Sequence, residues 1–479
     1  RDENYHIFRV SRARSAAVRS SEQVRWSEEQ QRRPRVVPRA IDPMYANQWH
    51  LHGSPWGIDA DRVPANLTGK GVTIAIVDDG LQHIHPEISP NYAAAHSYNY
   101  NDPQSDDPAP HPDDDHGTAA AGVAVAAKDN GYCGRGVAPG AKVSGIRLIA
   151  DAVTDMTEAT ALTLHAMSDN DIFSCSWGPD DDGHTMAGPG FLTERAMALY
   201  AGQLRGRLGR GSIYVWAAGN GRDNGDSCAF DGYASSPFAF AIGAIDNAGK
   251  RAWYSEGCAA LLAVAPSSGN GGGIVTSDLL GPNGYSPTDC TDRFNGTSAA
   301  APMAAGVIAL MLQKRPELTW RDVKHIIARA AVPINQGDGS WHINAAGFHH
   351  SHEYGFGLLK LLPLLEEVGR HTLLPPQYRF WTTGMRIIQA PTGFIPYTFD
   401  VAVNGTGIQF IEHVQLTCSL DHTSRGSVTI TLQSPQGTIS RMADERAFDR
   451  GRNYPAGGWT FTSVRHWGES AAGNWTVNV

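Results

Sequence analysis

Three short segments of the sequence carry an aspartate, a histidine and a serine that could together activate a nucleophile. Asp78 stands in IVDDG, His116 in DDDHGT and Ser298 in NGTSAAAP. A serine hydroxyl is a weak nucleophile at its own pKa, so it needs an imidazole as base, and the imidazole needs a carboxylate to fix its tautomer. Each residue alone would more often be a turn residue, a structural histidine or a helix N-cap. Their order and their flanking residues together favour nucleophilic catalysis.

A second group of residues with chemical potential is acidic. Asp180, Asp181 and Asp182 lie on one loop in SCSWGPDDDGHT, and Asp226 and Asp231 lie in DSCAFDGYASS. Clustered carboxylates repel one another, so they need cations. The cluster is either a solvated acidic face or a groove that pairs with calcium and with Arg and Lys of a peptide, and we expect the groove.

The segments that carry the candidate catalytic residues lie among predicted strands and helices. From Gly71 onward, short apolar runs alternate with Ala-rich stretches of helical period, in the order GVTIAIVDDG, GTAAAGVAVAA, AKVSGIRLI, DIFSCSWG, GSIYVWAAGN and FAFAIGAI. This alternation predicts a parallel α/β sheet with helices on both faces. Ligands bind beyond the carboxyl ends of such strands, where the loops with Asp78, Trp177 and Asn220 would lie.

Helical periodicity stops after LLPPQYRF, and alternating segments such as EHVQLTCSL and SVTITLQS follow. The change predicts an all-β domain over residues 373–479, after an α/β domain over residues 40–372. The chain ends in WTVNV, so we expect the β domain to be incomplete.

Composition limits the broad class. The chain has 479 residues, of which 41% are apolar and 18% charged, enough for two or three domains with buried cores. No apolar run is long enough to span a membrane. The net charge is −9, although residues 1–41 hold ten arginines against five acidic residues. The acidic body argues against a nucleic-acid partner, and the six cysteines form no CxxC pair for zinc or redox chemistry.

The chain resembles the subtilisin-like serine proteases, whose catalytic residues follow the same order, Asp, His and Ser, on a parallel α/β fold. The resemblance implies that Ser298 attacks a peptide carbonyl, that His116 takes and returns the proton, and that Asp78 orients the imidazole. It also implies that Asn220, in WAAGNG, stabilises the oxyanion.

Over residues 5–479 the chain more closely resembles the kexin-like proprotein convertases, because of its acidic segments. The basic substrate residue directly before the scissile bond would then meet Asp181 and Asp231. The basic residue at the second position would meet Asp79 and Asp113, and that at the fourth position would meet Glu158 and Tyr233. The family usually has an aspartate where AGP places Ala187, which weakens the expectation of a strict requirement at the fourth position.

The same resemblance implies two calcium sites, each needing several carboxylate and carbonyl oxygens. The first would use Asp42, Glu87 and Asn130 with the backbone carbonyls of Ala127, Tyr132 and Gly134, although Glu87 stands where Asp is more usual. The second would use Asp181, Asp226 and Glu256, directly behind the pocket for the arginine.

The resemblance also pairs Cys133 with Cys290 and Cys228 with Cys258. Cys175, in an apolar run, is expected to be a buried thiol, and Cys418 to lie in a strand of the β domain.

The basic residues 1–39 resemble the C-terminal part of a convertase propeptide. Self-cleavage is expected after Arg35 in RRPR or Arg39 in RVVPR, with an internal cut after Arg14 in RVSRARSA. The β region resembles the P domain of the family, and the segments GFHHSHEYGFGLL and TFTSVRHWGES resemble its type 7 branch.

Together these features predict a calcium-dependent, monomeric serine endoprotease of the secretory pathway. It would cleave precursor polypeptides after paired or clustered basic residues and mature by cutting its own propeptide. Two alternatives are a secreted subtilisin of broad specificity and a catalytically silent binding or sorting protein. The acidic segments argue against the first, and the intact triad with Asn220 argues against the second.

Overall fold

The computed structural model describes residue 17 and residues 41–479, apart from residues 269–270, 382–395 and 403–407. The expected cleavage positions Arg14, Arg35 and Arg39 lie outside the described residues. Contacts group residues Ala40–Val479 into one unit.

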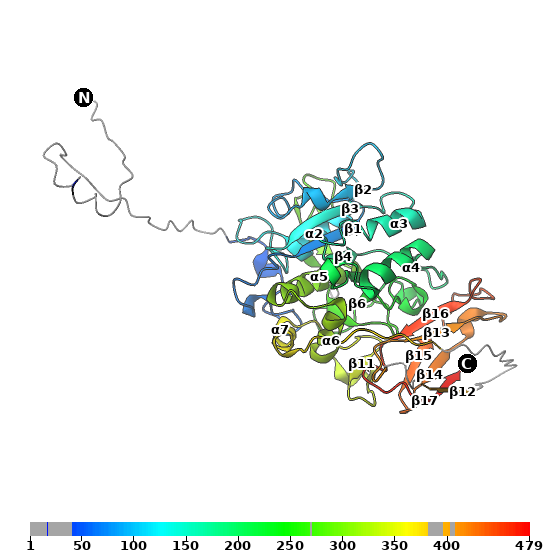
Figure 1. The fold of residues 1–479 in the computed structure, drawn as a ribbon. Helices are drawn as coiled ribbons and strands as arrows, with labels where there is room; N and C mark the ends of the chain where they lie inside the picture. Colours follow the sequence, from blue (N-terminus) through cyan, green and yellow to red (C-terminus); the bar gives the residue numbers. More distant parts are fainter. Residues whose placement is uncertain (1–16, 18–40, 269–270, 382–395, 403–407) are drawn as a thin grey trace, which may run out of the picture. The chain divides into compact units, whose positions relative to one another are not determined.

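The centre of this unit is a seven-stranded sheet in which every strand pairing is parallel (Figure 1). Its middle strands are buried along their whole length, as expected when both faces of a sheet are covered. The strands lie in the order β2 (Tyr98–Asn99), β3 (Lys142–Arg147), β1 (Thr73–Asp78), β4 (Ile172–Cys175), β5 (Ile213–Ala217), β6 (Ala239–Ile245) and β7 (Ala263–Pro266).

Helices alternate with these strands along the chain, as the sequence predicts. Two of them, α2 and α5, contact each other and the sheet and begin at its catalytic edge. The α-helices in the described residues are α2 (His116–Val125), α3 (Asp155–Ala161), α4 (Phe191–Met197), α5 (Thr297–Lys314), α6 (Trp320–Ala330) and α7 (Leu361–Arg370).

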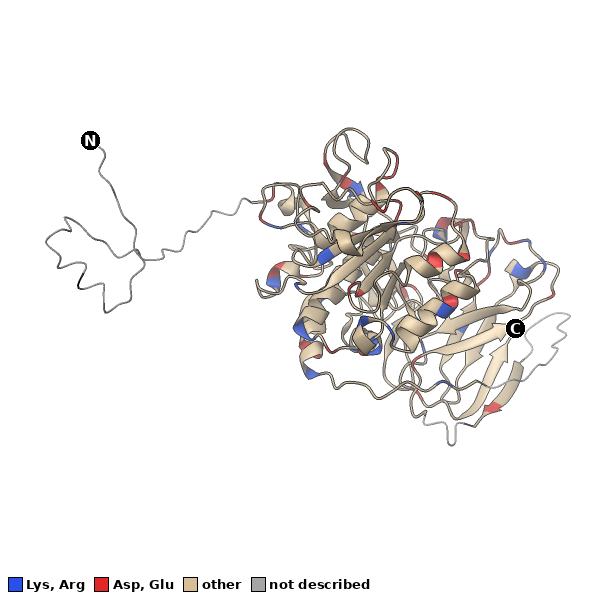
Figure 2. Ribbon diagram, turned by 45° about the horizontal axis from the view of Figure 1, so that its top comes forward, with Lys and Arg blue, Asp and Glu red and all other residues tan. Residues whose placement is uncertain are grey.

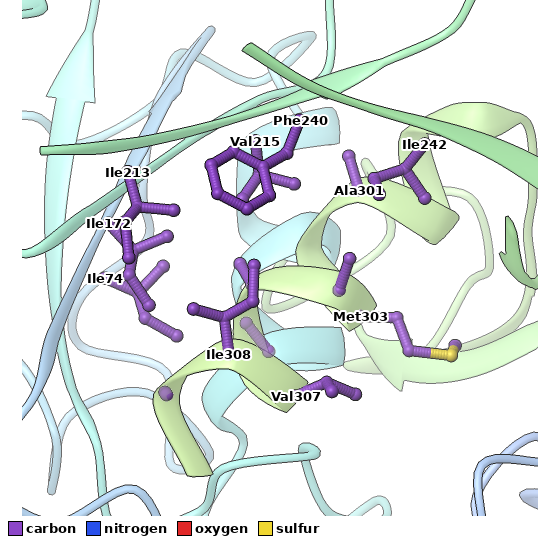
Figure 3. Packing of buried hydrophobic residues seen from close by; sticks show 14 of the residues in the cluster. Ile74, Ile172, Ile213, Val215, Phe240, Ile242, Ala301, Met303, Val307 and Ile308 are labelled. Carbon is purple, nitrogen blue, oxygen red and sulfur yellow. The ribbon is translucent and has the colours of Figure 1, made fainter. Parts of the chain in front are cut away.

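Helix α5 provides the central packing surface. All of its first 16 residues, Thr297 to Leu312, are buried, and its many alanines let the backbone lie close to the sheet. Figure 3 shows Ile308 of this helix packed near Ile74, Ile172 and Ile213, which stand beside one another on three adjacent strands.

Two antiparallel hairpins extend the α/β part. One joins β8 (Ile274–Ser277) to β9 (Cys290–Phe294), just before α5. The other joins β10 (Trp341–Ile343) to β11 (His349–Ser351).

After α7 the described elements are antiparallel strands, so the predicted change from an α/β to an all-β segment is confirmed. A four-stranded sheet has the order β12 (Pro396–Val401), β17 (Gly473–Asn478), β14 (Ile430–Gln433) and β15 (Ile439–Ala443), and β13 (Val414–Cys418) pairs with β16 (Trp459–Ser463).

Most charged residues lie outside the strands of the parallel sheet. In Figure 2 the strands of the parallel sheet are largely tan, and most red and blue segments lie on loops and helix surfaces. No helix in the described ranges combines the length and the hydropathy needed to cross a membrane.

The packing around α5 makes a first prediction. Replacing Ile308→Ala leaves a cavity beneath the sheet and should lower the free energy of unfolding by about 2–5 kcal/mol. Met156→Ala is the matched control, because that side chain is 66% exposed. Urea unfolding monitored by circular dichroism measures both; equal losses in the two variants would contradict the assignment of α5 to the core.

Candidate active site

Three elements bring Asp78, His116 and Ser298 to one edge of the sheet. Asp78 is the last residue of β1, His116 the first of α2 and Ser298 the second of α5. The ring nitrogen Nδ1 of His116 lies 2.8 Å from Oδ1 of the buried Asp78. Because the carboxylate engages Nδ1, the other nitrogen, Nε2, is the one left to accept a proton.

The charges around His116 set its basicity. Burial lowers the pKa of His116, but the charge and hydrogen bond of Asp78, with smaller contributions from Asp79 and Asp115, raise it to about 9. A general base must be neutral to accept a proton. A cation that neutralises Asp79 would therefore lower the pKa of His116 and favour its basic form.

The hydroxyl of Ser298 points to Ser176 rather than to His116 in this structure. Ser298 Oγ donates to the carbonyl of Ser176 at 3.4 Å, and Ser176 Oγ donates to the carbonyl of Ser298 at 3.1 Å. The second contact has a simple cause: Pro302, four residues after Ser298, has no N–H to occupy that carbonyl. Ser176 thus ties the first turn of α5 to the end of β4.

The side-chain amide of Asn220 is oriented by the start of α5. Its Oδ1 accepts from Thr297 N at 2.8 Å and from Thr297 Oγ1 at 3.0 Å. Only the oxygen of an amide can accept these two bonds, so the NH₂ group lies on the opposite side of the amide. The backbone N–H of Asn220 donates to Asp181 Oδ2 at 3.0 Å, which links the amide to the acidic loop.

The expected pocket residues Glu158, Asp231 and Tyr233 lie together. Tyr233 OH donates to Glu158 Oε1 at 2.7 Å, and Asp231 accepts from Tyr233 N at 2.7 Å and Ala234 N at 3.2 Å. Burial, with the charges of Asp181 and Asp226, raises the pKa of Asp231 to about 7. Ala187, at the position where the related proteins usually have an acid, pairs with Asp231 in a parallel bridge.

The two residues expected to meet the second basic side chain, Asp79 and Asp113, have different surroundings. Asp79 is half-buried and accepts from the N–H groups of His116 and Gly117, at 3.1 and 2.8 Å, at the start of α2. Asp113 is exposed. Sequence reasoning missed Arg147, a buried residue at the end of β3 that donates through Nε to the carbonyl of Asp79 at 2.8 Å and through Nη2 to Asp114 at 2.6 Å.

The first expected calcium set contains an orphaned buried acid. Glu87 is fully buried and its carboxyl oxygens lack a well-formed hydrogen bond; burial raises its pKa to about 8, although the side chain of Asn130 acts in the opposite direction. Asp42 accepts from the backbone N–H groups of residues 129–131, and Asn130 Oδ1 accepts from Tyr132 N at 2.9 Å. The loop that carries Ala127, Tyr132 and Gly134 is joined to this cluster by a hydrogen bond from Ala127 N to Glu87 O at 2.9 Å.

The second expected set brings three carboxylates together. Burial and the charges of Asp226 and Asp181 raise the pKa of Glu256 well above its usual value. The backbone N–H of Gly221 donates to Glu256 Oε1 at 2.8 Å, and that of Gly183 donates to Asp226 Oδ2 at 2.8 Å. These bonds do not supply a full positive charge, so the donor chemistry fits a hard divalent cation at both sets. No cluster of three His, Cys, Asp or Glu side chains with metal-binding geometry occurs in the described ranges.

One cation that sequence reasoning missed reaches the second set from the antiparallel strands. Arg446 is fully buried; its Nη1 lies 3.3 Å from Asp226 Oδ1 and donates to the carbonyl of Thr185 at 2.7 Å. Arg425 donates to the carbonyl of His184 at 2.7 Å. The loop after β4 is therefore held by two arginines that are distant in sequence, and no local sequence signal points to this pairing.

The structure contains both expected disulfides, Cys133–Cys290 and Cys228–Cys258. Cys175 is a free buried thiol whose pKa is raised by burial, and the free Cys418 is the last residue of β13.

The electrostatics of His116 make a second prediction. Asp79→Asn removes one negative charge and should lower the pKa of His116, so more imidazole is neutral below pH 9. We expect the pH profile of the rate at which a sulfonyl fluoride modifies Ser298 to keep the same plateau. Its acid limb should move down by about one pH unit. Asp113→Asn is the control, because Asp113 is exposed. A limb unchanged in Asp79→Asn, or moved equally in both variants, would contradict this account.

Comparisons with known proteins agree with this geometry. Residues 69–357 match the Subtilase family and residues 411–479 match the Proprotein convertase P-domain. Among solved structures, the serine protease of Aeromonas sobria superposes with a TM-score of 0.80 at 25% identity, over 92% of this chain and 88% of that chain.

Curated relatives extend the match beyond the parallel sheet. The chain is 42% identical to proprotein convertase subtilisin/kexin type 7 of Mus musculus, over 96% of this chain and 61% of that protein. It is 38% identical to type 4 of the same organism, over 96% of this chain and 71% of that protein, and 39% identical to kexin of Saccharomyces cerevisiae, over 91% and 54%. The chain thus spans about three fifths of the length of its type 7 relatives. The expected resemblance to the type 7 branch is confirmed, and the chain belongs to the subtilase family of serine proteases, in its proprotein convertase and kexin branch.

Proposed function

We propose that this chain is a calcium-dependent serine endoprotease that cleaves precursor polypeptides after paired or clustered basic residues. The observation that carries the proposal is the group of carboxylates beside Asn220. Asp231 and Glu256 each interact electrostatically with Asp181 and Asp226. Arg446 pairs with Asp226, and among the described residues no ion pair reaches the other three. A basic substrate side chain and a metal ion would supply the missing positive charge.

The substrate pocket discriminates by the cost of leaving a buried acid unpaired. Asp231 is 9% exposed, and its pKa of about 7 reflects burial and neighbouring carboxylates. An Arg guanidinium in the pocket would stabilise the ionised form of Asp231, whereas an apolar residue would bury it without a partner. The penalty is about 2–5 kcal/mol for a truncated charge pair.

The chemistry itself is carried by four side chains. Ser298 Oγ turns from the carbonyl of Ser176 towards His116, gives its proton to Nε2 and attacks the peptide carbonyl. Asp78 holds Nδ1 and stabilises the imidazolium that forms. The NH₂ group of Asn220, which Thr297 directs away from itself, donates to the developing oxyanion. His116 then returns the proton to the leaving amine.

Calcium, when bound at the Asp42, Glu87 and Asn130 set and at the Asp181, Asp226 and Glu256 set, supplies positive charge that keeps these buried carboxylates ionised. The orphaned oxygens of Glu87 support the first site, and the mutual repulsion around Glu256 supports the second. Asp181 is shared between the second set and the substrate pocket, so loss of calcium should also weaken substrate binding.

The proposal includes maturation and compartment. The basic segment of residues 1–39 would be an inhibitory propeptide that the enzyme cuts after Arg35 or Arg39 and again after Arg14. Disulfides of the kind seen at Cys133–Cys290 and Cys228–Cys258 form in oxidising compartments, which supports a site of action in the secretory pathway or outside the cell.

The decisive assay compares kcat/KM on two fluorogenic peptides that differ only before the scissile bond, Arg-x-Lys-Arg and Arg-x-Lys-Leu. We expect the arginine peptide to be favoured by about 30-fold or more, from the unpaired-charge penalty above. Both rates should fall to background with a calcium chelator and in Ser298→Ala. Asp231→Asn should lose most of the preference, with the exposed Asp180→Asn as its control.

Each other outcome favours a specific alternative. Comparable rates on both peptides would indicate a subtilisin of broad specificity. No hydrolysis of either peptide by mature protein that binds calcium would indicate a binding or sorting protein. Full activity in the presence of the chelator would remove calcium from the mechanism.

A further inference from the structure

Arg465, which follows strand β16, is a buried cation that has no counter-ion among the described residues. The residue is 6% exposed, and its Nε is sealed from solvent without a hydrogen-bond partner. Burial and the nearby Arg441 lower the pKa of Arg465 to about 10, and no acid offsets them. A guanidinium is costly to bury without an anion, so this arrangement requires an explanation.

The residues around Arg465 add positive or neutral donors rather than acids. Burial and then the charge of Arg465 lower the pKa of His350 to about 3, and the same two causes lower that of His352. The pKa of His342 is also lowered by burial and by Arg465. Arg441 has one acidic partner, Asp444, at 2.9 Å and at the surface.

The acid closest along the chain, Glu469, makes its hydrogen bonds with other residues. Its Oε1 accepts from the N–H of Ala345 at 3.0 Å and from the hydroxyl of Thr438, its Oε2 is buried without a partner, and its charge acts on His466. Only burial and Arg441 shift the pKa of Arg465. Among the described residues, no Asp or Glu forms an ion pair with Arg465.

A cavity of about 620 Å³ lies in front of this arginine. It is formed between the β10–β11 hairpin and the turn that joins β14 to β15, so both the α/β part and the antiparallel part contribute to it. The side chain of Arg441, one of its lining residues, is 59% exposed. Its basic lining residues are His342, His352, Arg441 and Arg465, and no Asp or Glu lines it.

We propose that this cavity binds a tetrahedral oxyanion, a sulfate or phosphate group, between Arg465 at its floor and Arg441 and His342 at its mouth. The planar fork of a guanidinium matches two oxygens of such a group. The two arginines give charge-assisted donors, and the neutral imidazole of His342 adds one N–H. The bound anion would join the β10–β11 hairpin to the antiparallel strands. The site shares no residue with the triad or the acidic pocket, so it goes beyond the proposed protease function.

The test is isothermal titration of inorganic sulfate into the full chain carrying Ser298→Ala, which prevents self-digestion, at constant ionic strength set with chloride. We expect one saturable site. Arg441→Ala should weaken it by about tenfold, the loss of one charge-assisted contact, and His342→Gln should weaken it less, because the histidine donor is neutral. Arg465→Met should abolish it. Arg452→Ala is the control, because Arg452 is a surface arginine of the same antiparallel segment with its side chain 72% exposed.

Two arms sharpen the result. If Arg465→Met does not fold, the exposed Arg441 and His342 variants still decide the question. A monosaccharide sulfate titrated in parallel identifies the source, since tighter binding than inorganic sulfate points to an anion carried on a sugar and weaker binding to the free ion. Absence of saturable binding, equal binding of chloride, or equal losses in Arg441→Ala and Arg452→Ala would overturn the proposal, whatever the peptide assays show.

Discussion

Repulsion among clustered carboxylates is the interaction on which the arrangement of this site depends. Asp181, Asp226, Asp231 and Glu256 come from loops that follow three adjacent strands, β4, β5 and β6. Burial and the charges of Asp181 and Asp226 raise the pKa of Asp231 and of Glu256. Parallel strands place their carboxyl ends at one edge, so the sheet itself creates the crowding. Protein hydrogen bonds and Arg446 relieve only part of it, and the remainder favours cationic ligands.

The backbone around the catalytic amide is built on this acidic cluster. The N–H groups of Asn220 and Gly221 donate to Asp181 and Glu256, while the Asn220 side chain bonds to Thr297 beside the nucleophile. Gly219 adopts a φ of +99°, and a Cβ there would lie 2.5 Å from Glu256 Oε1. The Asn220 amide therefore keeps its position only while the cluster keeps its geometry, which would couple the charge balance of the cluster to the proposed oxyanion site.

The antiparallel segment takes part in the same balance. Arg446 lies with its guanidinium 3.9 Å from the centre of the Phe230 ring and pairs with Asp226, and Trp459 donates to the carbonyl of Ala229 at 2.9 Å. Phe230 packs edge-on against Phe461 of β16. The loop that carries Asp226 and Asp231 is thus held from the α/β side by a disulfide at Cys228 and from the other side by the P-domain strands.

Sequence reasoning reached those features that are local or ordered along the chain. The alternation of strands and helices predicted the parallel sheet, the loss of helical period predicted the antiparallel segment, and both are confirmed. The loops with Asp78, Trp177 and Asn220 were expected at one edge because ligands bind beyond the carboxyl ends of parallel strands, and Asp78, His116 and Ser298 were grouped by their order and flanking residues. The roles of these residues stay predictions.

The features that sequence reasoning missed all depend on partners far apart in the chain. Ser176 holds the start of α5 because Pro302 has no N–H for the carbonyl of Ser298, which lies 122 residues from Ser176 in sequence. Arg446 matters because it lies against Asp226 across a separation of 220 residues. Arg465 is notable only because, in the part of the chain that the structure describes, no Asp or Glu forms an ion pair with it. A single sequence lists charged residues, but only packing decides which of them are buried and which are paired.

The central claim is that buried carboxylates at this edge of the sheet hold calcium, and a count of bound ions tests it most directly. Equilibrium dialysis of Ser298→Ala protein against radioactive calcium should give two tightly bound ions per chain. Adding Glu256→Gln should remove one of them, whereas the exposed Glu366→Gln should remove none. If Glu256→Gln protein folds and binds as many ions as its parent, the cluster is not a calcium site and the account of its charge balance is wrong.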